Sequence, residues 1–358
     1  MDRLVQLVGL GVVTLALLDI YLTVLYPSLT SSLVSLPLCK GIWRLFRLTA
    51  SAMPFNRDQV LSHCGPITII AIIVLWVSLL LCGFALISWP ELGSSIKASQ
   101  EQTPTDFATA LYYSGYALTT LGSGDILPKT SAHRLLILLQ AAIGFSIFTL
   151  TITYILAVYS ALAIRNTFAL SLHYRTASTG DALELLTRLG ASGEFNDSRQ
   201  EIADIARELI NLLEAQHSYP VLLYFRFRQT LYAMPRILFL AMDTATLIKS
   251  ALNCEKNRPL IHSTAVAELW GSGLQLVIEL SRSLVPKGRS TINEQREKLW
   301  RERYYQAVER LRAEGIETVT DLEEGANLYI SLRGKWEPAL ARLTDYMAYK
   351  WGEIAVGE

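Results

Sequence analysis

The first 164 residues of this chain carry very little charge. They contain 8 Lys or Arg and 7 Asp or Glu, whereas the remaining 194 residues contain 24 and 25. A charged share of roughly a quarter is ordinary for a soluble domain, so only the second half fits that class. The chain as a whole has no net charge, so its composition indicates no nucleic-acid partner. We predict a membrane unit followed by a soluble unit.

Cysteine is also scarce, and its spacing excludes two kinds of site. The four cysteines form no CxxC pair and have no histidine at ligand spacing (Cys39, Cys64, Cys82 and Cys254). This pattern argues against a zinc site and against a disulfide framework. We therefore expect free thiols and no structural metal.

The sequence motifs of common enzymes and nucleotide sites are missing as well. The chain has no GxGxxG after a strand, no Walker loop, no HExxH and no EF-hand loop. No nucleophile–base arrangement is recognisable, and the isolated His173, His217 and His262 fit surface or core roles. We expect no enzyme and no cofactor. A membrane-anchored enzyme would need an unrecognised site within 170–358.

What is present is a set of three long apolar runs, at 4–26, 66–89 and 135–164. About 20 apolar residues cross a bilayer, so each run is long enough. The third would measure about 45 Å as a helix and should tilt or project into the cytosol. A signal peptide is the alternative for the first run, but no clear small-x-small cleavage site follows it. We expect a retained N-terminal transmembrane helix within 1–30.

Basic residues predict the orientation of these spans. The segment 28–65 contains four of them against one acidic residue, Asp58 (Lys40, Arg44, Arg47 and Arg57). Such an excess places a loop inside the cell, so the N-terminus would lie outside and the C-terminal domain in the cytoplasm. Within this linker, 31–65, the stretch 41–53 mixes aromatic and basic residues. It is typical of an amphipathic helix on the membrane surface.

One ionisable residue, Asp19, lies inside the first apolar run. Intramembrane charges are functional candidates by default. The alternative is a structural hydrogen bond to a neighbouring helix or a position near the membrane interface, and the sequence favours this alternative without identifying a partner.

The stretch ALTTLGSGDILP, 117–128, separates the second and third runs. It follows 106–120, which reads as an apolar helix too short to span a bilayer. Non-helical backbone at membrane depth is tolerated only where it is buried in protein or lines a cavity. We therefore predict a re-entrant pore helix, 106–119, followed by a loop, 120–125, that lines a pore.

Together these segments resemble the potassium-channel pore domain over 66–165: outer helix 66–89, pore helix, filter and inner helix 134–164. More closely, they resemble bacterial single-pore channels with a TTLGxGD filter and an extra N-terminal helix. The resemblance implies that potassium ions bind backbone carbonyls of four identical chains. The corresponding filter residues are Thr119, Thr120, Leu121, Gly122, Ser123, Gly124 and Asp125.

The resemblance points to two further features, both in the predicted inner helix. Gly144 lies where the family has its hinge glycine. Phe148, Ile152 and Leu156 recur every four residues after it, as expected either for a hydrophobic gate or for helix packing.

The departure from the family is Ser123, where an aromatic residue usually braces the filter. The possible neighbours of this serine on the pore helix are Tyr112, Tyr113 and Tyr116. Serine puts strict potassium selectivity in question, unless Tyr112 or Tyr113 fills the gap. Three possibilities follow: a potassium channel, a non-selective cation channel, or a non-conducting membrane sensor or scaffold whose helical domain binds a partner. A transporter with four pore units in one chain does not fit, because this chain has one.

The soluble half, 170–358, reads as a helical bundle. Capping boxes occur at 198–201, 291–294 and 320–323. The apolar stretch 219–242 contains arginines, so we expect a pair of core helices there and not a fourth span. Alternating charges at 294–303 predict a solvated helix face. The fold class is therefore all-α, and the regulatory ligand of this domain, if it has one, is not identifiable from the sequence.

Overall fold

The computed structural model describes residues 2–26, 32–53, 56–99, 102–191, 195, 198–284 and 294–356. It confirms the all-α prediction. Among these residues the named strands are one antiparallel pair, β1 (Ile96–Ala98) and β2 (Ile126–Pro128). The chain forms two compact units. The membrane unit comprises Met1–Leu45, Cys64–Ser160 and Ser218–Val221, and the C-terminal unit comprises Phe46–His63, Ala161–His217 and Leu222–Glu358.

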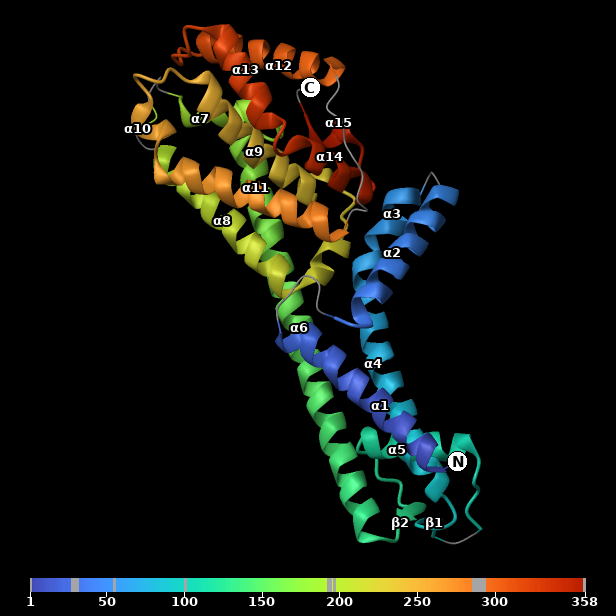
Figure 1. Ribbon diagram of the computed structural model, residues 1–358. Coiled ribbons are helices and arrows are strands. Elements are labelled where there is room, and N and C mark those ends of the chain that lie inside the picture. Colours follow the sequence, from blue (N-terminus) through green and yellow to red (C-terminus); the bar gives the residue numbers. More distant parts are fainter. Residues whose placement is uncertain are drawn as a thin grey trace. The chain divides into compact units, whose positions relative to one another are not determined.

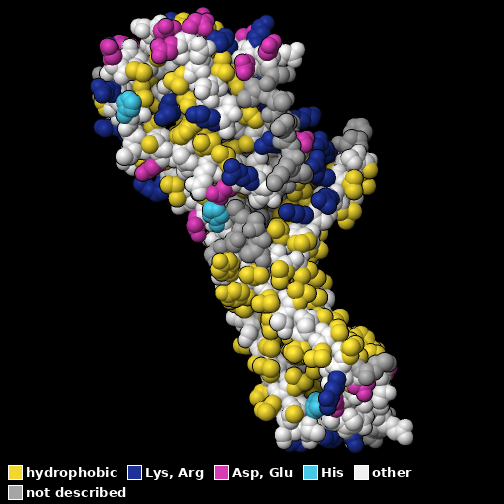
Figure 2. Space-filling view, viewed as in Figure 1, with side chains coloured by type: hydrophobic (Ala, Val, Ile, Leu, Met, Phe, Trp, Pro, Cys, Tyr) yellow, Lys and Arg dark blue, Asp and Glu magenta, His cyan; other side chains and the backbone are white. Residues whose placement is uncertain are grey.

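Three helical segments of the described chain are long and apolar enough to cross a bilayer: Asp2–Leu25, Arg57–Glu91 and Ser131–Arg175. The first is α1 (Asp2–Ile20) with a π-helical end at Tyr21–Leu25, and the second contains α3 (Arg57–Ser62) and α4 (Cys64–Ser88). The third is α6 (Ser131–Arg175), one unbroken helix that begins before the predicted inner helix and ends beyond it. Figure 2 shows hydrophobic side chains covering the membrane helices, whereas charged side chains concentrate on the C-terminal unit.

Helices α1 and α4 pack closely through two glycines. A Cβ added to Gly9 would lie 2.6 Å from the Gly83 carbonyl oxygen, and one added to Gly83 would lie 2.7 Å from the Val13 side chain. In a bilayer, where apolar burial does not drive helices together, such close approach provides the van der Waals contact that does. The two glycines therefore fix α1 against α4.

Asp19 is fully buried and forms the structural hydrogen bonds that the sequence favoured. Its Oδ1 accepts from the backbone N–H groups of Val34 at 2.7 Å and Ser35 at 3.2 Å, at the start of α2 (Ser35–Ala52). Its Oδ2 accepts from the Ser35 hydroxyl and from Trp76 Nε1, the latter at 2.9 Å. A carboxylate at a helix N-terminus satisfies N–H groups that have no partner within the helix. Asp19 thus joins α1, α2 and α4.

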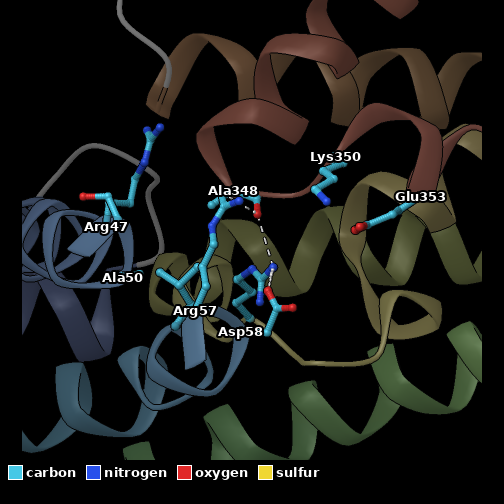
Figure 3. A pocket seen from close by; sticks show the side chains of 10 residues that line it. Arg47, Ala50, Arg57, Asp58, Ala348, Lys350 and Glu353 are labelled. Atoms are coloured by element: carbon cyan, nitrogen blue, oxygen red, sulfur yellow. Dashed lines mark hydrogen bonds and ion pairs between the residues drawn. The ribbon is translucent and has the colours of Figure 1, made fainter. Parts of the chain in front are cut away.

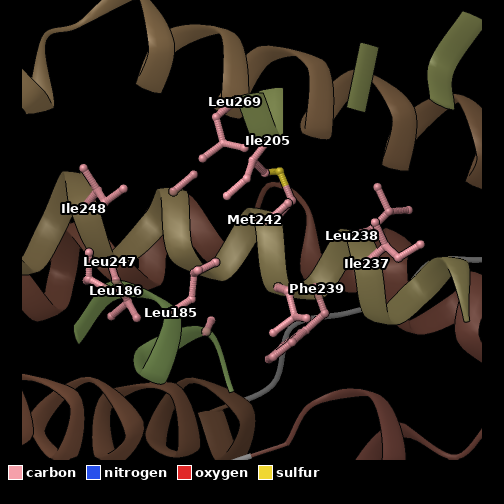
Figure 4. Packing of buried hydrophobic residues seen from close by; sticks show 14 of the residues in the cluster. Leu185, Leu186, Ile205, Ile237, Leu238, Phe239, Met242, Leu247, Ile248 and Leu269 are labelled. Atoms are coloured by element: carbon pink, nitrogen blue, oxygen red, sulfur yellow. The ribbon is translucent and has the colours of Figure 1, made fainter. Parts of the chain in front are cut away.

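The C-terminal unit is built around α9 (Met234–Ala251). All of its residues except Lys249 are buried, as expected of a helix that is enclosed on every side. It packs against α7 (Ala182–Leu189), α11 (Thr264–Leu284), α13 (Leu322–Arg333) and α14 (Glu337–Tyr346). Figure 1 shows α9 among these helices, and Figure 4 shows Met242 and Leu247 among neighbours such as Leu269 and Leu186. Around this core lie α8 (Ser198–Ser218), α10 (Arg258–Ile261), α12 (Glu294–Ala313) and α15 (Trp351–Ile354).

Two details of the soluble half differ from the sequence predictions. The stretch 219–242 is not a helix pair, because only α9 is α-helical and two 3₁₀ turns, Pro220–Tyr224 and Thr230–Tyr232, precede it. The cap of α13 is Asp321, not Thr320, since the Asp321 side chain accepts from the N–H groups of Glu323 and Glu324. The Ser198 hydroxyl donates to the Leu189 carbonyl. The box at 291–294 lies mostly outside the described residues.

The prediction of a solvated face on α12 is wrong for Arg303. This side chain is buried, and it donates to Asp243 Oδ2 at 2.8 Å and to Asp181 Oδ1 at 2.9 Å. Asp243 also accepts from the Tyr329 hydroxyl and from Arg333, and both partners are buried. Burial of four polar groups is tolerated here because each one has charged or hydrogen-bonding partners. This buried charge cluster fixes α9, α12 and α13 to one another.

Candidate ion-conduction site

The predicted pore helix is α5 (Phe107–Leu118). Asp106 caps it, accepting from Thr109 N at 2.9 Å. One face, including Tyr113 and Tyr116, is buried in the membrane unit. From the inner helix α6, Gln140 Nε2 donates to the Ser114 carbonyl at 2.7 Å. The end of α5 is thereby held in place, and the loop that follows starts from a fixed point.

The backbone of that loop alternates in handedness. Thr120, Gly122 and Gly124 have φ values of 58°, 62° and 77°, in the left-handed region, and the residues between them are not among those with positive φ. In an ordinary strand successive carbonyls point to opposite sides. Reversing the backbone handedness at every second residue turns the successive carbonyls toward one side. Glycine allows this at two of the three positions, while Thr120 adopts it at a steric cost.

The hydrogen bonds of the loop leave these carbonyls free. The N–H groups of Leu121 and Gly122 both donate to the Tyr116 carbonyl, at 2.9 and 3.5 Å, and Thr120 N donates to Ala117 O at 3.2 Å. Within the described part of the chain, no hydrogen bond ends on the carbonyl oxygens of residues 120–123. The loop therefore directs its donors to the pore helix and keeps a row of acceptors available.

The outer end of the loop is held by the strand pair. The Ser99 hydroxyl donates to the Gly124 carbonyl at 2.9 Å, and Ser99 N donates to the Asp125 carbonyl at 2.8 Å. Ser99 directly follows β1. Strand β1 pairs with β2, and Ile96 of β1 lies opposite Pro128 of β2. These bonds mark where the row of free carbonyls ends.

Ser123 is connected to the pore helix through Tyr112. The Tyr112 hydroxyl donates to Ser123 Oγ at 3.1 Å, and Ser123 Oγ donates to Asp125 Oδ1 at 2.5 Å. This second bond lowers the pKa of the Asp125 carboxyl below its usual range. A second tyrosine, Tyr116, donates its hydroxyl to the Ile126 carbonyl just past the loop. The sequence named Tyr112 only as one of three possible neighbours, with Tyr113 and Tyr116, because helical spacing alone does not show which ring faces the loop.

Gly144 lies where α6 meets the end of the pore helix. A Cβ added there would lie 1.8 Å from the Leu118 carbonyl oxygen, which no side chain can do without a backbone shift. Helix α6 continues through this position without interruption. The structure thus gives Gly144 a packing role beside the hinge role that the resemblance implies.

An apolar cavity of about 550 Å³ adjoins this contact, and its lining includes Thr119, Thr120, Gly144 and Phe148. In the single chain Phe148, Ile152 and Leu156 are 65, 45 and 66 % exposed, so the rest of the chain covers them only in part. Leu121 is 72 % exposed. These apolar side chains are left for lipid, for a pore, or for other copies of the chain.

Other kinds of site find little support in the described ranges. The described ranges contain no group of three or more His, Cys, Asp or Glu side chains placed to hold a metal ion. All four cysteines are free, and Cys39 and Cys64 are buried. His217 is not isolated, since its Nε2 lies 2.6 Å from Glu279 Oε2.

Comparison with known proteins agrees with this geometry. Residues 68–161 match the family model described as "Ion channel", so this segment is similar to the pore domains of ion channels. The chain is also 26 % identical over 222 residues to the uncharacterized membrane protein YdjJ of Bacillus subtilis (strain 168), a match that covers 62 % of this chain and 62 % of that protein. The matched region thus spans less than two thirds of that relative. No solved structure matches the chain significantly.

Proposed function

We propose that this protein is a homotetrameric channel that passes potassium ions passively through the backbone carbonyls of residues 119–124, with Asp125 at the outer mouth. The observation that carries the proposal is the alternating φ of Thr120, Gly122 and Gly124, together with the free carbonyls of this loop. A dehydrated cation needs a shell of oxygens, and a row of carbonyls that faces one side can replace its water.

Assembly as a tetramer follows from the number of oxygens. One chain contributes one row of carbonyls, which is one quarter of a closed shell in this type of channel. The exposed apolar side chains of α6 and of Leu121 fit the same arrangement, because a ring of four copies would cover part of them. In this proposal the lipid bilayer covers the rest of the membrane unit.

Potassium selectivity is favoured over non-selective permeation by the Tyr112–Ser123 bond. Serine does not brace the filter by itself, but the tyrosine hydroxyl reaches it from the pore helix. A braced filter keeps its carbonyls at the spacing that suits one ion. A non-selective channel remains the competing function if this one bond per subunit is too weak.

We place the gate at Phe148, Ile152 and Leu156, which could close the pore by excluding water. The basic linker 31–65 supports an orientation with the C-terminal unit in the cytoplasm and the N-terminus outside. In that position the C-terminal unit would regulate the gate.

The direct test is current through purified protein in a planar bilayer, under opposed potassium and sodium gradients. We expect potassium-selective single-channel current, and native mass measurement in detergent should give a tetramer. Gly122→Ala should abolish the current because its φ of 62° disfavours any side chain. The matched control is Gly11→Ala, where an added Cβ meets nothing within 4 Å. Absence of current in native, tetrameric protein would favour the non-conducting sensor instead.

A further inference from the structure

A second pocket, which is polar, lies wholly within the C-terminal unit, apart from the filter. It has a volume of about 500 Å³. Its charged lining comprises four cations and two carboxylates: Arg47, Arg57, Arg226 and Lys350, with Asp58 and Glu353. Figure 3 shows Arg57 and Asp58 approaching it from one element, and Lys350 and Glu353 lining it from the C-terminal segment. The excess of positive charge points to an anionic ligand.

The positive charges of this pocket are only partly compensated. Arg226 is buried, and its Nη2 donates to Asp58 Oδ1 at 2.6 Å and to the Ala348 carbonyl at 3.2 Å, while Nε donates to Met347 O at 3.2 Å. Its Nη1 is buried and has no partner among the described residues. One carboxylate, itself 57 % exposed, is therefore the sole ion-pair partner found for a buried guanidinium. The electric field of the Arg226 guanidinium therefore acts on the pocket with little screening.

The other three cations have even less compensation. Within the described ranges the Arg57 side chain donates only to the Ala348 carbonyl, at 3.3 Å. The Lys350 ammonium has neither a hydrogen bond nor an ion pair in the part of the chain that the structure describes, and Arg47 reaches Asp345 only at 3.9 Å. Arginine offers paired donors that match phosphate oxygens, and lysine adds a point charge.

We propose that this pocket binds a phosphate-bearing ligand, with Arg57 and Lys350 as its main contacts. A volume of about 500 Å³ lies within the usual range of small-ligand sites and exceeds the needs of a bare phosphate. The ligand is therefore a phosphate ester or a diphosphate. It is either the headgroup of an anionic phospholipid or a soluble compound, since both present the same oxygens.

The position of the pocket in the chain gives the ligand a regulatory role. Arg57 and Asp58 begin α3, and α3 leads through His63 into the outer pore helix α4. A ligand held between Arg57 and Lys350 would fasten the start of that helix to the segment 347–353. This regulatory step rests on the proposed channel function, whereas the binding itself does not.

The test measures binding to the full-length protein in nanodiscs, without any measurement of current. One arm titrates inorganic pyrophosphate into phosphatidylcholine nanodiscs by calorimetry. The other compares retention of phosphatidic acid with that of phosphatidylcholine by native mass spectrometry. Saturable binding in the first arm identifies a soluble ligand, and selective retention in the second identifies a lipid headgroup.

Arg57→Gln and Lys350→Gln should each weaken the binding about tenfold, as expected for the loss of one charge-assisted contact. The matched control is Lys335→Gln, an exposed cation of the same unit that does not line the pocket, and it should change nothing. An unchanged unfolding temperature would show that the variants remain folded. No binding in either arm, or binding that survives both substitutions, would overturn the inference. Binding by a non-conducting protein would leave it standing and reject only the channel function.

Discussion

The hydroxyl of Tyr112 lies 3.1 Å from Ser123 Oγ, so a side chain of the pore helix braces the loop at the position where the potassium-channel family usually has an aromatic residue. The brace is inverted in comparison with that family. The aromatic ring stands on the helix, and the small hydroxyl stands on the loop.

Removal of the Tyr112 hydroxyl should weaken discrimination between potassium and sodium. Each hydrogen bond contributes about 1 kcal/mol, and a tenfold permeability ratio corresponds to about 1.4 kcal/mol. Tyr112→Phe should therefore lower the ratio by about fivefold, measured as a reversal potential under bi-ionic conditions. Ser123→Ala also removes the bond to Asp125, so it should lower the ratio at least as much, and the double substitution should add little to the effect of Ser123→Ala. The control is Tyr113→Phe, whose hydroxyl has no hydrogen bond in the described structure. An unchanged ratio in Tyr112→Phe would show that the bond does not set selectivity.

Gly144→Ala should disturb the pore helix. The new methyl group would meet the Leu118 backbone at 1.8 Å, and relief of that clash by a helix shift costs about 1–3 kcal/mol. We expect a lower unfolding temperature in detergent and reduced current. Gly41→Ala is the control, because its Cβ would meet nothing within 4 Å. A variant that keeps its stability and changes only its gating would instead favour the hinge role.

Asp19→Asn tests whether this buried carboxylate is structural. The substitution places an amide donor where Asp19 accepts from Val34 N and Ser35 N or from Trp76 Nε1. A buried donor that faces another donor costs about 1–3 kcal/mol, so the unfolding temperature should fall. Asp2→Asn, at an exposed position of the same helix, should leave it unchanged. Normal stability combined with lost current would assign Asp19 a functional role.

Asp243 should make the C-terminal unit sensitive to acid. Burial raises the pKa of this carboxyl, but Arg303 and Arg333 outweigh that effect, and the net pKa lies below its usual range. A lowered folded pKa gives a contribution to stability that is complete above the unfolded pKa of about 4 and is lost as the pH falls through the folded value. Unfolding followed by near-UV circular dichroism should show this loss below about pH 4.

Asp243→Asn should remove that part of the acid dependence and should lower the free energy of unfolding at neutral pH by about 3–5 kcal/mol, because it removes the buried carboxylate that Arg303 and Arg333 share. Asp345→Asn is the control, since the Asp345 side chain is 87 % exposed and should contribute little. Equal stability of the two variants at neutral pH would contradict the argument.

The membrane spans and the all-α class could be predicted because they depend on composition and local periodicity. The partners of buried polar groups could not. Asp19 meets Trp76, 57 positions along the chain, and Arg303 meets Asp243, 60 positions away. No local pattern contains such pairs. Arg303 in particular stands among alternating charges that are typical of an exposed face, and only the packing of α12 on α9 removes it from water.

The candidate site likewise combines features that the sequence predicted with features that it did not. The glycine spacing indicated a loop of unusual backbone, and the structure places left-handed residues at both glycines. It also places one at Thr120, which the spacing gave no reason to expect. The steric role of Gly144 depends on the crossing of α5 and α6, so a resemblance that names a hinge does not reveal it.

The left-handed Thr120 has a thermodynamic consequence. A β-branched residue in this region costs about 1–3 kcal/mol, and the free carbonyls beside it repel one another when no cation lies between them. In the proposed channel, a cation bound by these carbonyls would offset both costs and stabilise this conformation of the loop. Linkage then requires that potassium raise the melting temperature of the assembled protein as its concentration exceeds the dissociation constant of the filter. The ion would be part of the fold as well as its cargo.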